Sequence, residues 1–134
     1  MKRLIIHLNG GIGNQMFQYA FGRSMALDLN YELVLDNWSG YVRDHVYQRQ
    51  YELGKMKIKG RIANNCERIP FWLHRFESKY TGDVMPLHRK HLYGDFVKET
   101  TYIYHANLFS ALAQRNTWIF GYWQSPRYFS KHNP

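Results

Sequence analysis

A glycine-rich turn near the N-terminus carries the residues best suited to chemistry. Gly10, Gly11 and Gly13 stand between an apolar, β-branched run and a long apolar segment typical of a helix. Glycines let the backbone turn sharply and approach a ligand closely, and a helix N-terminus offers unpaired N–H groups to an anion. The turn is therefore predicted to face a phosphate group. The competing interpretation is that the glycines only make a tight connection between a strand and a helix.

Amide side chains follow this turn, and polar residues recur at a second place in the chain. Asn14, Gln15 and Gln18 begin the predicted helix, where an amide either caps the helix or hydrogen-bonds a sugar hydroxyl. A second polar and aromatic cluster follows a predicted strand near the C-terminus and consists of Tyr122, Trp123, Gln124 and Ser125. Because ligands of open α/β sheets gather at the carboxyl ends of strands, the two clusters are predicted to form one site.

Two other phosphate-binding motifs fit the turn less well. Asp36 lies 23 positions after Gly13, as in dinucleotide-binding folds, but the third glycine of G-x-G-x-x-G would fall at Met16. No Lys-Ser or Lys-Thr pair follows the turn, which excludes a Walker A loop. A Rossmann oxidoreductase is therefore disfavoured.

The seven histidines suggest a metal site at first sight. His88 and His91 have a spacing that suits zinc on a helix, and Cys66 or His105 would complete a set. The two residues between these histidines are Arg and Lys, which would repel a cation. The sequence therefore predicts basic surface here and no metal. No Ser-His-Asp arrangement follows from the spacing of residues, so no catalytic residue is assigned.

The charge of the chain points to an anionic partner. Of 134 residues, 18 are Lys or Arg and 10 are Asp or Glu, which gives a formal net charge of +8. This excess suits a phosphorylated substrate, a nucleic acid or an anionic membrane surface. Nucleic acid is disfavoured because the basic residues are scattered and no nucleic-acid-binding motif is present. A single cysteine, Cys66, and the lack of a signal-peptide or membrane-spanning run predict a cytoplasmic protein with peripheral membrane contact at most.

The elements that must position these residues form a βαβ unit. Residues 3–8 and 32–36 are predicted as buried strands, and residues 15–29 as a helix so apolar all round that it should be buried on a sheet. Asn30 is predicted to end that helix in the left-handed conformation. A parallel sheet with a right-handed crossover follows, so the fold class is α/β, with a Rossmann-like parallel sheet in one domain over residues 1–134.

The remainder of the chain is less regular. Apolar and basic residues alternate over 55–62, which predicts an edge strand with a basic face, and 71–80 is predicted as a short amphipathic helix. Residues 117–120 are predicted as a strand, and Ser125 followed by Pro126 predicts the start of a further helix. The chain stops soon after that start, so the domain is expected to be truncated.

Residues 8–23, LNGGIGNQMFQYAFGR, resemble the N-terminal signature of the bacterial α-1,2-fucosyltransferases, glycosyltransferase family 11. Three shorter patches resemble the same family in the same order, at 33–36, at 49–53, and at 121–125 with residues 128 and 129. The resemblance spans almost the whole chain. It implies a GT-B architecture, in which two Rossmann-like domains face a cleft, and this chain resembles the N-terminal, acceptor-side domain.

The resemblance also implies an activity and a site. Members of the family transfer fucose from GDP-fucose to the 2-hydroxyl of a galactose-containing glycan, with inversion and without a metal or other cofactor, in the synthesis of surface polysaccharide. The glycine-rich loop lies at the donor, a role that carries over to Gly11, Gly13 and Asn14. Contact with the donor or substrate is expected of Gly10, Gly11, Gly13, Asn14, Gln15, Gln18, Tyr122, Trp123 and Gln124.

One motif of the family is missing. His-x-Arg-Arg-x-Asp-Tyr should follow the patch at 121–125, and nothing in the chain matches it. Its arginines would offset the charge of the GDP leaving group. The chain is therefore expected to lack the GDP-fucose-binding domain of such an enzyme and to be inactive alone. The alternative function, from a different class, is a glycan-binding module that uses the same aromatic cleft without catalysis.

Overall fold

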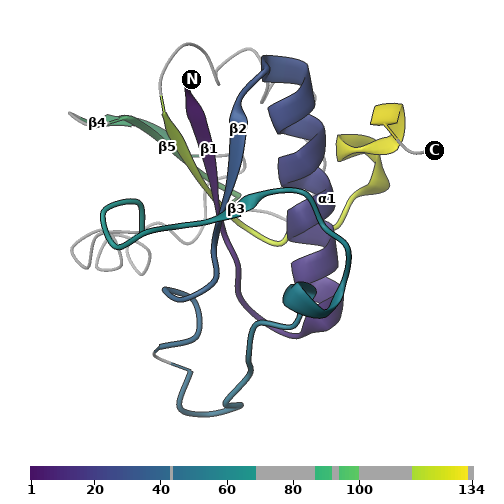
Figure 1. Ribbon diagram of the computed structural model, residues 1–134, viewed down its shortest axis with the longest axis vertical. Helices are drawn as coiled ribbons and strands as arrows, with labels where there is room; N and C mark the ends of the chain where they lie inside the picture. Colours follow the sequence, from purple (N-terminus) through teal and green to yellow (C-terminus); the bar gives the residue numbers. More distant parts are fainter. Residues whose placement is uncertain (43, 69–86, 92–93, 100–115, 133–134) are drawn as a thin grey trace.

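A six-stranded sheet organises the residues that the computed structural model describes, namely 1–42, 44–68, 87–91, 94–99 and 116–132 (Figure 1). The strands stand in the order β3-β2-β1-β6-β5-β4, and their bounds are β1 Arg3–His7, β2 Glu32–Asp36, β3 Arg61–Ile62, β4 Leu87–His91, β5 Gly94–Lys98 and β6 Thr117–Phe120. Neighbouring strands run parallel except at one edge, where β4 pairs antiparallel with β5. The predicted α/β class and Rossmann-like parallel sheet are confirmed.

The helix α1 (Ile12–Leu29) connects the parallel strands β1 and β2 and lies against one face of the sheet (Figure 1). Asn30 ends it in the left-handed conformation, with a φ of 56°, as predicted. The prediction of a helix buried all round is wrong, because Met16 and Leu27 are 49% and 45% exposed. The sheet covers only one side of α1. That side includes polar residues, so apolar character alone does not show which side of this helix is buried.

The core between α1 and the sheet is built around three aromatic rings. Phe21 of α1 stacks on Trp123 with ring centroids 4.2 Å apart, and Tyr128 meets both rings edge-on. Aliphatic side chains of β1, β2, β5 and β6 complete this side of the core. Ile5 and Val34 are buried on the opposite face of the sheet. The central strands are therefore apolar on both faces, as is typical of parallel sheets.

The segment after β6 differs from the predicted helix. It forms two short 3₁₀ helices, η2 (Pro126–Tyr128) and η3 (Ser130–His132), and the side chain of Ser125 makes no capping bond. Tyr128 of this segment is nevertheless buried in the core. Its packing against the Phe21 ring holds the segment beside α1.

The edge strand predicted over 55–62 is much shorter in the structure. Only β3 is extended, and it follows a 3₁₀ helix, η1 (Leu53–Lys55). Ile58 packs against the core beside α1, and the N–H of Lys59 donates to the Tyr19 hydroxyl at 2.9 Å. Residues 58 and 59 thus contact the core and α1 before the chain enters the sheet as β3. The helix predicted over 71–80 lies outside the described residues.

Four charged side chains form an ion-pair network beside β1, β2 and β3. The guanidinium of Arg61 bonds Glu32 at 2.9 Å and the two oxygens of Glu67 at 2.7 and 2.8 Å, and Arg3 reaches Glu67 at 3.2 Å. The Glu67 side chain is only 5% exposed. Hydrogen bonds from Arg61 lower the pKa of Glu67 from its usual 4.5 to about 2.

The variant Glu67→Gln is expected to be less stable at neutral pH and less sensitive to acid than the wild type. Because the folded-state pKa lies below 4.5, the charge of Glu67 stabilises the fold fully above that pH, and this contribution is lost as the pH falls toward 2. One pKa unit corresponds to about 1.4 kcal/mol, so the fall from 4.5 to about 2 limits the loss to about 3.5 kcal/mol. Urea unfolding from about pH 7 to about pH 2 measures it.

Glu52→Gln serves as the matched control, because it removes only an exposed ion pair with Lys55 at 3.8 Å. Its acid dependence should match that of the wild type. If Glu67→Gln lost stability with acid as steeply as the wild type, the network would not be the source of the acid dependence.

Candidate functional site

The carboxyl ends of β1, β2, β5 and β6 meet at one edge of the sheet, because these strands run parallel. The glycine-rich turn follows β1, residues 37–52 follow β2, and Glu99 follows β5. The cluster of Tyr122, Trp123 and Gln124 follows β6, the direct neighbour of β1. Ligands of open α/β sheets bind at this edge, so the candidate site lies here.

The glycines of the turn differ in whether their positions have space for a side chain. Gly10 has a φ of 74°, and a Cβ there would lie 2.7 Å from Nδ2 of Asn14, so this glycine is needed for the shape of the turn. A Cβ at Gly11 or Gly13 would meet no atom within 4 Å. Gly11 is the N-cap of α1, and no side chain caps the helix there. The first turn of α1 is therefore open to a ligand and offers uncapped N–H groups to an anion.

Asn14 links the glycine-rich turn to the segment that leaves β6. Its Oδ1 accepts a hydrogen bond of 2.9 Å from Nε2 of Gln124, so the two clusters predicted from the sequence are in contact. Within the described residues, Nδ2 of Asn14 has no acceptor. An amide held by its oxygen, with its N–H groups unused, is suited to donate to a phosphate or sugar oxygen.

Gln15 is wholly buried and bonds inside the chain. Its Nε2 donates to the carbonyl oxygens of Gly10 and Gln50 at 3.0 and 2.9 Å, and its Oε1 accepts from the N–H of Glu52 at 2.9 Å. The structure thus places Gln15 behind the turn, where it ties the turn to the loop after β2.

Gln18 has a similar position on the other side of the turn. It is wholly buried, its Nε2 donates to Oδ1 of Asn9 and to the carbonyl of Gly121, and its Oε1 accepts from the N–H of Asn9. Gln18 therefore joins the ends of β1 and β6. Both buried glutamines position the candidate site and do not lie on its surface.

Trp123 belongs to the core. Its side chain has no exposed surface, and its backbone has a φ of 53°, which is rare for a residue other than glycine. Tyr122 is half-buried, and its N–H donates to Oε1 of Glu99 at 3.1 Å, as does the N–H of Trp123. Of the three residues predicted after β6, Gln124 is the exposed one, and it lies beside Asn14.

Glu99 is a candidate site residue that the sequence did not indicate. Burial raises the pKa of its carboxyl, although the bonds from Trp123 and Tyr122 act in the opposite direction. Within the described residues, no donor reaches its Oε2. A carboxyl group with a raised pKa at a ligand-binding edge is suited to accept a proton. Glu99 lies at the site because β5 pairs in parallel with β6, and no local pattern in the sequence predicts that pairing.

Asp36 holds the turn after β2 in shape and is not placed to bind the ribose of a nucleotide. It is fully buried, and its Oδ1 accepts from the N–H groups of Trp38 and Ser39 at 3.1 and 3.0 Å. This turn brings Gly40 against the end of β1, where a Cβ would lie 2.1 Å from the carbonyl oxygen of Leu8. The geometry around Asp36 gives the dinucleotide interpretation no support.

The histidines considered for zinc lie in a different element from the one assumed. His88 and His91 belong to the strand β4, so the helical spacing does not apply to them. His105 lies outside the described residues. No group of three or more His, Cys, Asp or Glu side chains that could hold a metal occurs in the part of the chain that the structure describes.

Comparison with known proteins links the chain to carbohydrate chemistry. No protein-family model matches it, and no solved structure gives a significant match. An α-1,2-colitosyltransferase of Escherichia coli is 26% identical over 149 aligned residues, which cover 98% of this chain and 42% of that protein. The chain thus spans less than half the length of this relative. The similarity extends over nearly all of the chain and supports a relationship to the glycosyltransferases.

Proposed function

We propose that this chain is the N-terminal, acceptor-side domain of a glycosyltransferase that moves fucose from GDP-fucose to the 2-hydroxyl of a galactoside, with inversion. The observation that carries the proposal is the glycine-rich turn. It lies at the carboxyl edge of the sheet, is open at Gly11 and Gly13, and is joined to the exit of β6 by Asn14 and Gln124. The similarity to an α-1,2-colitosyltransferase supports sugar transfer as the reaction class, and the family resemblance of residues 8–23 supports fucose as the sugar.

In this proposal the first turn of α1 faces the donor diphosphate. Its uncapped N–H groups and the Nδ2 group of Asn14 donate to phosphate oxygens, which accumulate charge as the sugar leaves. No metal is part of the proposal. Cationic groups that balance the rest of the leaving-group charge would come from the remainder of a whole enzyme, because the 134 residues hold no His-x-Arg-Arg-x-Asp-Tyr motif.

The proposed location is the cytoplasm, with peripheral contact to an anionic membrane surface where surface polysaccharide is built. The net charge of +8 supports such contact. None of the described helices has the length and apolar character of a membrane span.

The variant Gly13→Val tests the donor site. A Cβ at Gly13 would meet no atom of the described chain within 4 Å, so the fold should tolerate a side chain there. It would occupy the space through which a phosphate approaches α1. In a calorimetric titration of the whole transferase, we expect GDP-fucose to bind the variant at least about tenfold more weakly, with an unchanged melting temperature. The φ of Gly13 is not positive, so a Cβ there does not strain the backbone of the turn.

Leu27→Val is the matched control, because it adds a β-branched residue at the far end of the same helix, at a 45% exposed position. Its affinity for GDP-fucose should equal that of the wild type. Unchanged affinity in folded Gly13→Val would overturn the donor site. A whole wild-type protein that binds saccharides but not GDP-fucose would favour the glycan-binding module instead.

A further inference from the structure

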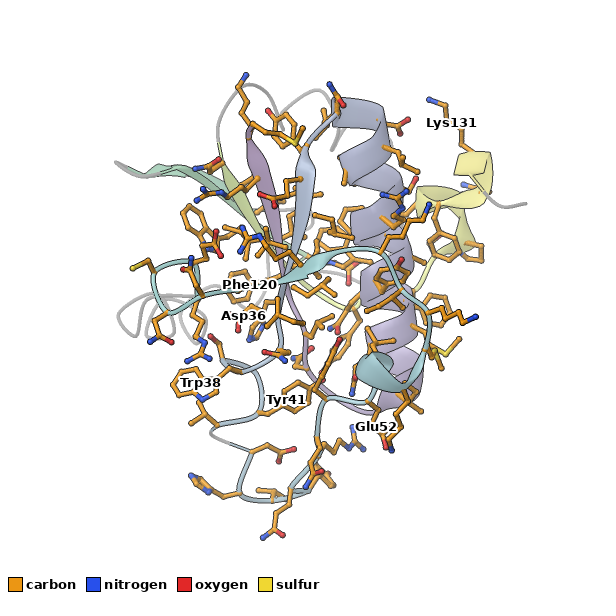
Figure 2. The ribbon with its side chains drawn as sticks, in the orientation of Figure 1. Asp36, Trp38, Tyr41, Glu52, Phe120 and Lys131 are labelled. Carbon is orange, nitrogen blue, oxygen red and sulfur yellow. The ribbon has the colours of Figure 1, made fainter. Side chains whose placement is uncertain are left out.

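A groove of about 400 Å³ lies beside the glycine-rich turn, in the loop that follows β2. Its walls include the aromatic residues Trp38, Tyr41 and Tyr51 and the amides Asn37, Gln48 and Gln50. In Figure 2, Tyr41 lies on the side of this loop toward the N-terminal end of α1, and Trp38 lies on the other side. The volume falls within the range of about 300–1,000 Å³ that is usual for small-molecule sites.

The groove is held in shape by bonds that do not involve its amide side chains. The Asp44 carboxylate accepts from the backbone N–H groups of Tyr47 and Arg49 at 2.9 and 3.0 Å, which closes the outer turn of the loop. Gln15 holds the backbone carbonyl of Gln50 at 2.9 Å. The Tyr41 hydroxyl donates to the carbonyl of Gly10 at 3.4 Å, so the groove and the glycine-rich turn are neighbours.

The polar side chains of the groove remain available for a ligand. Within the described residues, the amides of Asn37, Gln48 and Gln50 make no side-chain hydrogen bond. An amide both donates and accepts, which suits hydroxyl groups. Arg49 and Asp44 bring one positive and one negative charge to the lining, so the groove has no excess of either sign. These groups favour an uncharged, hydroxyl-rich ligand over a nucleotide or a phosphate.

The aromatic side chains supply the apolar part of the surface. Trp38 is 46% exposed, and the guanidinium of Arg68 lies 4.6 Å from its ring centroid, a cation–π contact that restrains the ring. Tyr41 is half-buried, burial raises the pKa of its phenol, and its hydroxyl donates to the carbonyl of Gly10. A pyranose ring presents both C–H faces and hydroxyls, and this combination of aromatic rings and amides matches both.

We infer that this groove binds an uncharged saccharide, and that the saccharide is the acceptor of the sugar. The second part of this inference rests on the proposed function. The groove adjoins the turn assigned to the donor, because the hydroxyl of Tyr41, which lines the groove, donates to the carbonyl of Gly10 in that turn. Residues 37–51 are thus the part of this chain that selects the acceptor.

The test is a titration of the ¹⁵N-labelled chain with N-acetyllactosamine, a galactose-containing disaccharide, followed by amide shifts. Shifts should concentrate in residues 37–51. Trp38→Ala and Gln50→Leu should each weaken binding at least about tenfold. Gln50→Leu keeps the backbone carbonyl that Gln15 holds, so it separates ligand contact from folding. Val46→Ala is the control, because Val46 is 82% exposed in the same loop but does not line the groove.

The outcomes separate this inference from the proposed function. Shifts outside 37–51, or full affinity in folded Trp38→Ala and Gln50→Leu, would overturn the groove as a saccharide site. If that result came with GDP-fucose binding that is lost in Gly13→Val, the donor site would stand alone. Saccharide binding in the groove without any GDP-fucose binding by the whole protein that carries this domain would keep the groove as a saccharide site and overturn both its acceptor role and the proposed transfer.

Discussion

Asn14→Ala is expected to lower the turnover of the whole transferase by about 10²–10³-fold while its fold stays intact. In the proposed mechanism the Nδ2 group of Asn14 donates to the departing diphosphate, where charge grows as the sugar leaves. Loss of one positioned donor of this kind typically costs about 2.7–4 kcal/mol of transition-state stabilisation. Turnover and melting temperature are to be measured together, on the same preparation.

The competing account treats Asn14 as a helix cap, and the structure distinguishes the two. The N-cap of α1 is Gly11, and the Asn14 side chain bonds Gln124 and caps no backbone group in the part of the chain that the structure describes. Loss of a true cap would cost typically about 1 kcal/mol of stability. Gln124→Ala is the control, because it removes the bond that orients Asn14 and should reduce turnover less than Asn14→Ala does. A lowered melting temperature with full turnover in Asn14→Ala would contradict the donor assignment.

Gly40→Ala is expected to destabilise the fold by about 3 kcal/mol, at the upper end of the usual cost of overpacking. The new Cβ would lie 2.1 Å from the carbonyl oxygen of Leu8 and 2.8 Å from Cβ of Asn9. The backbone at Leu8 cannot move away easily, because the N–H of Leu8 is bonded to the carbonyl of Asp36 at 3.1 Å. The loop after β2 would have to leave the sheet edge, so urea unfolding should show a much lower midpoint.

Gly13→Ala is the matched control for this experiment. It adds the same methyl group at a position where nothing lies within 4 Å. Alanine is also the better helix former, so stability should be equal or higher. If Gly40→Ala unfolded at the same urea concentration as the wild type, the close approach of this loop to β1 would be wrong.

The first part of the fold could be predicted because its signals are local. The apolar runs of β1, β2 and β6 and the left-handed Asn30 are each visible within a few residues of sequence. β4 and β5 were not predicted, because each is short and carries charged residues among few apolar ones. What places β5 in the sheet is its pairing with β6, which follows it only after a long intervening segment, and β4 joins the sheet through its pairing with β5. The missed role of Glu99 has the same cause.

The position of the site could be predicted from the sequence, but the burial of its individual residues could not. The turn after β1 and the cluster after β6 were predicted to form one site, and the structure places them in contact. The sequence could not show that Gln15 and Gln18 are buried, because their partners Gln50 and Gly121 come from other loops. Nor could it show that Trp123 turns into the core, since an aromatic residue after a strand is equally common at a binding surface.

The pairing of β1 with β6 has a consequence for synthesis of the protein. Leu4 pairs with Thr117, so β1, a central strand of the sheet, lacks one of its two neighbours until the much later residues of β6 have been made. Until then, one edge of β1 presents unpaired N–H and C=O groups, and a strand edge of that kind is a template for wrong pairing between chains. Such distant pairing also slows folding. Newly made chains of this protein should therefore depend on chaperones until Thr117 has left the ribosome.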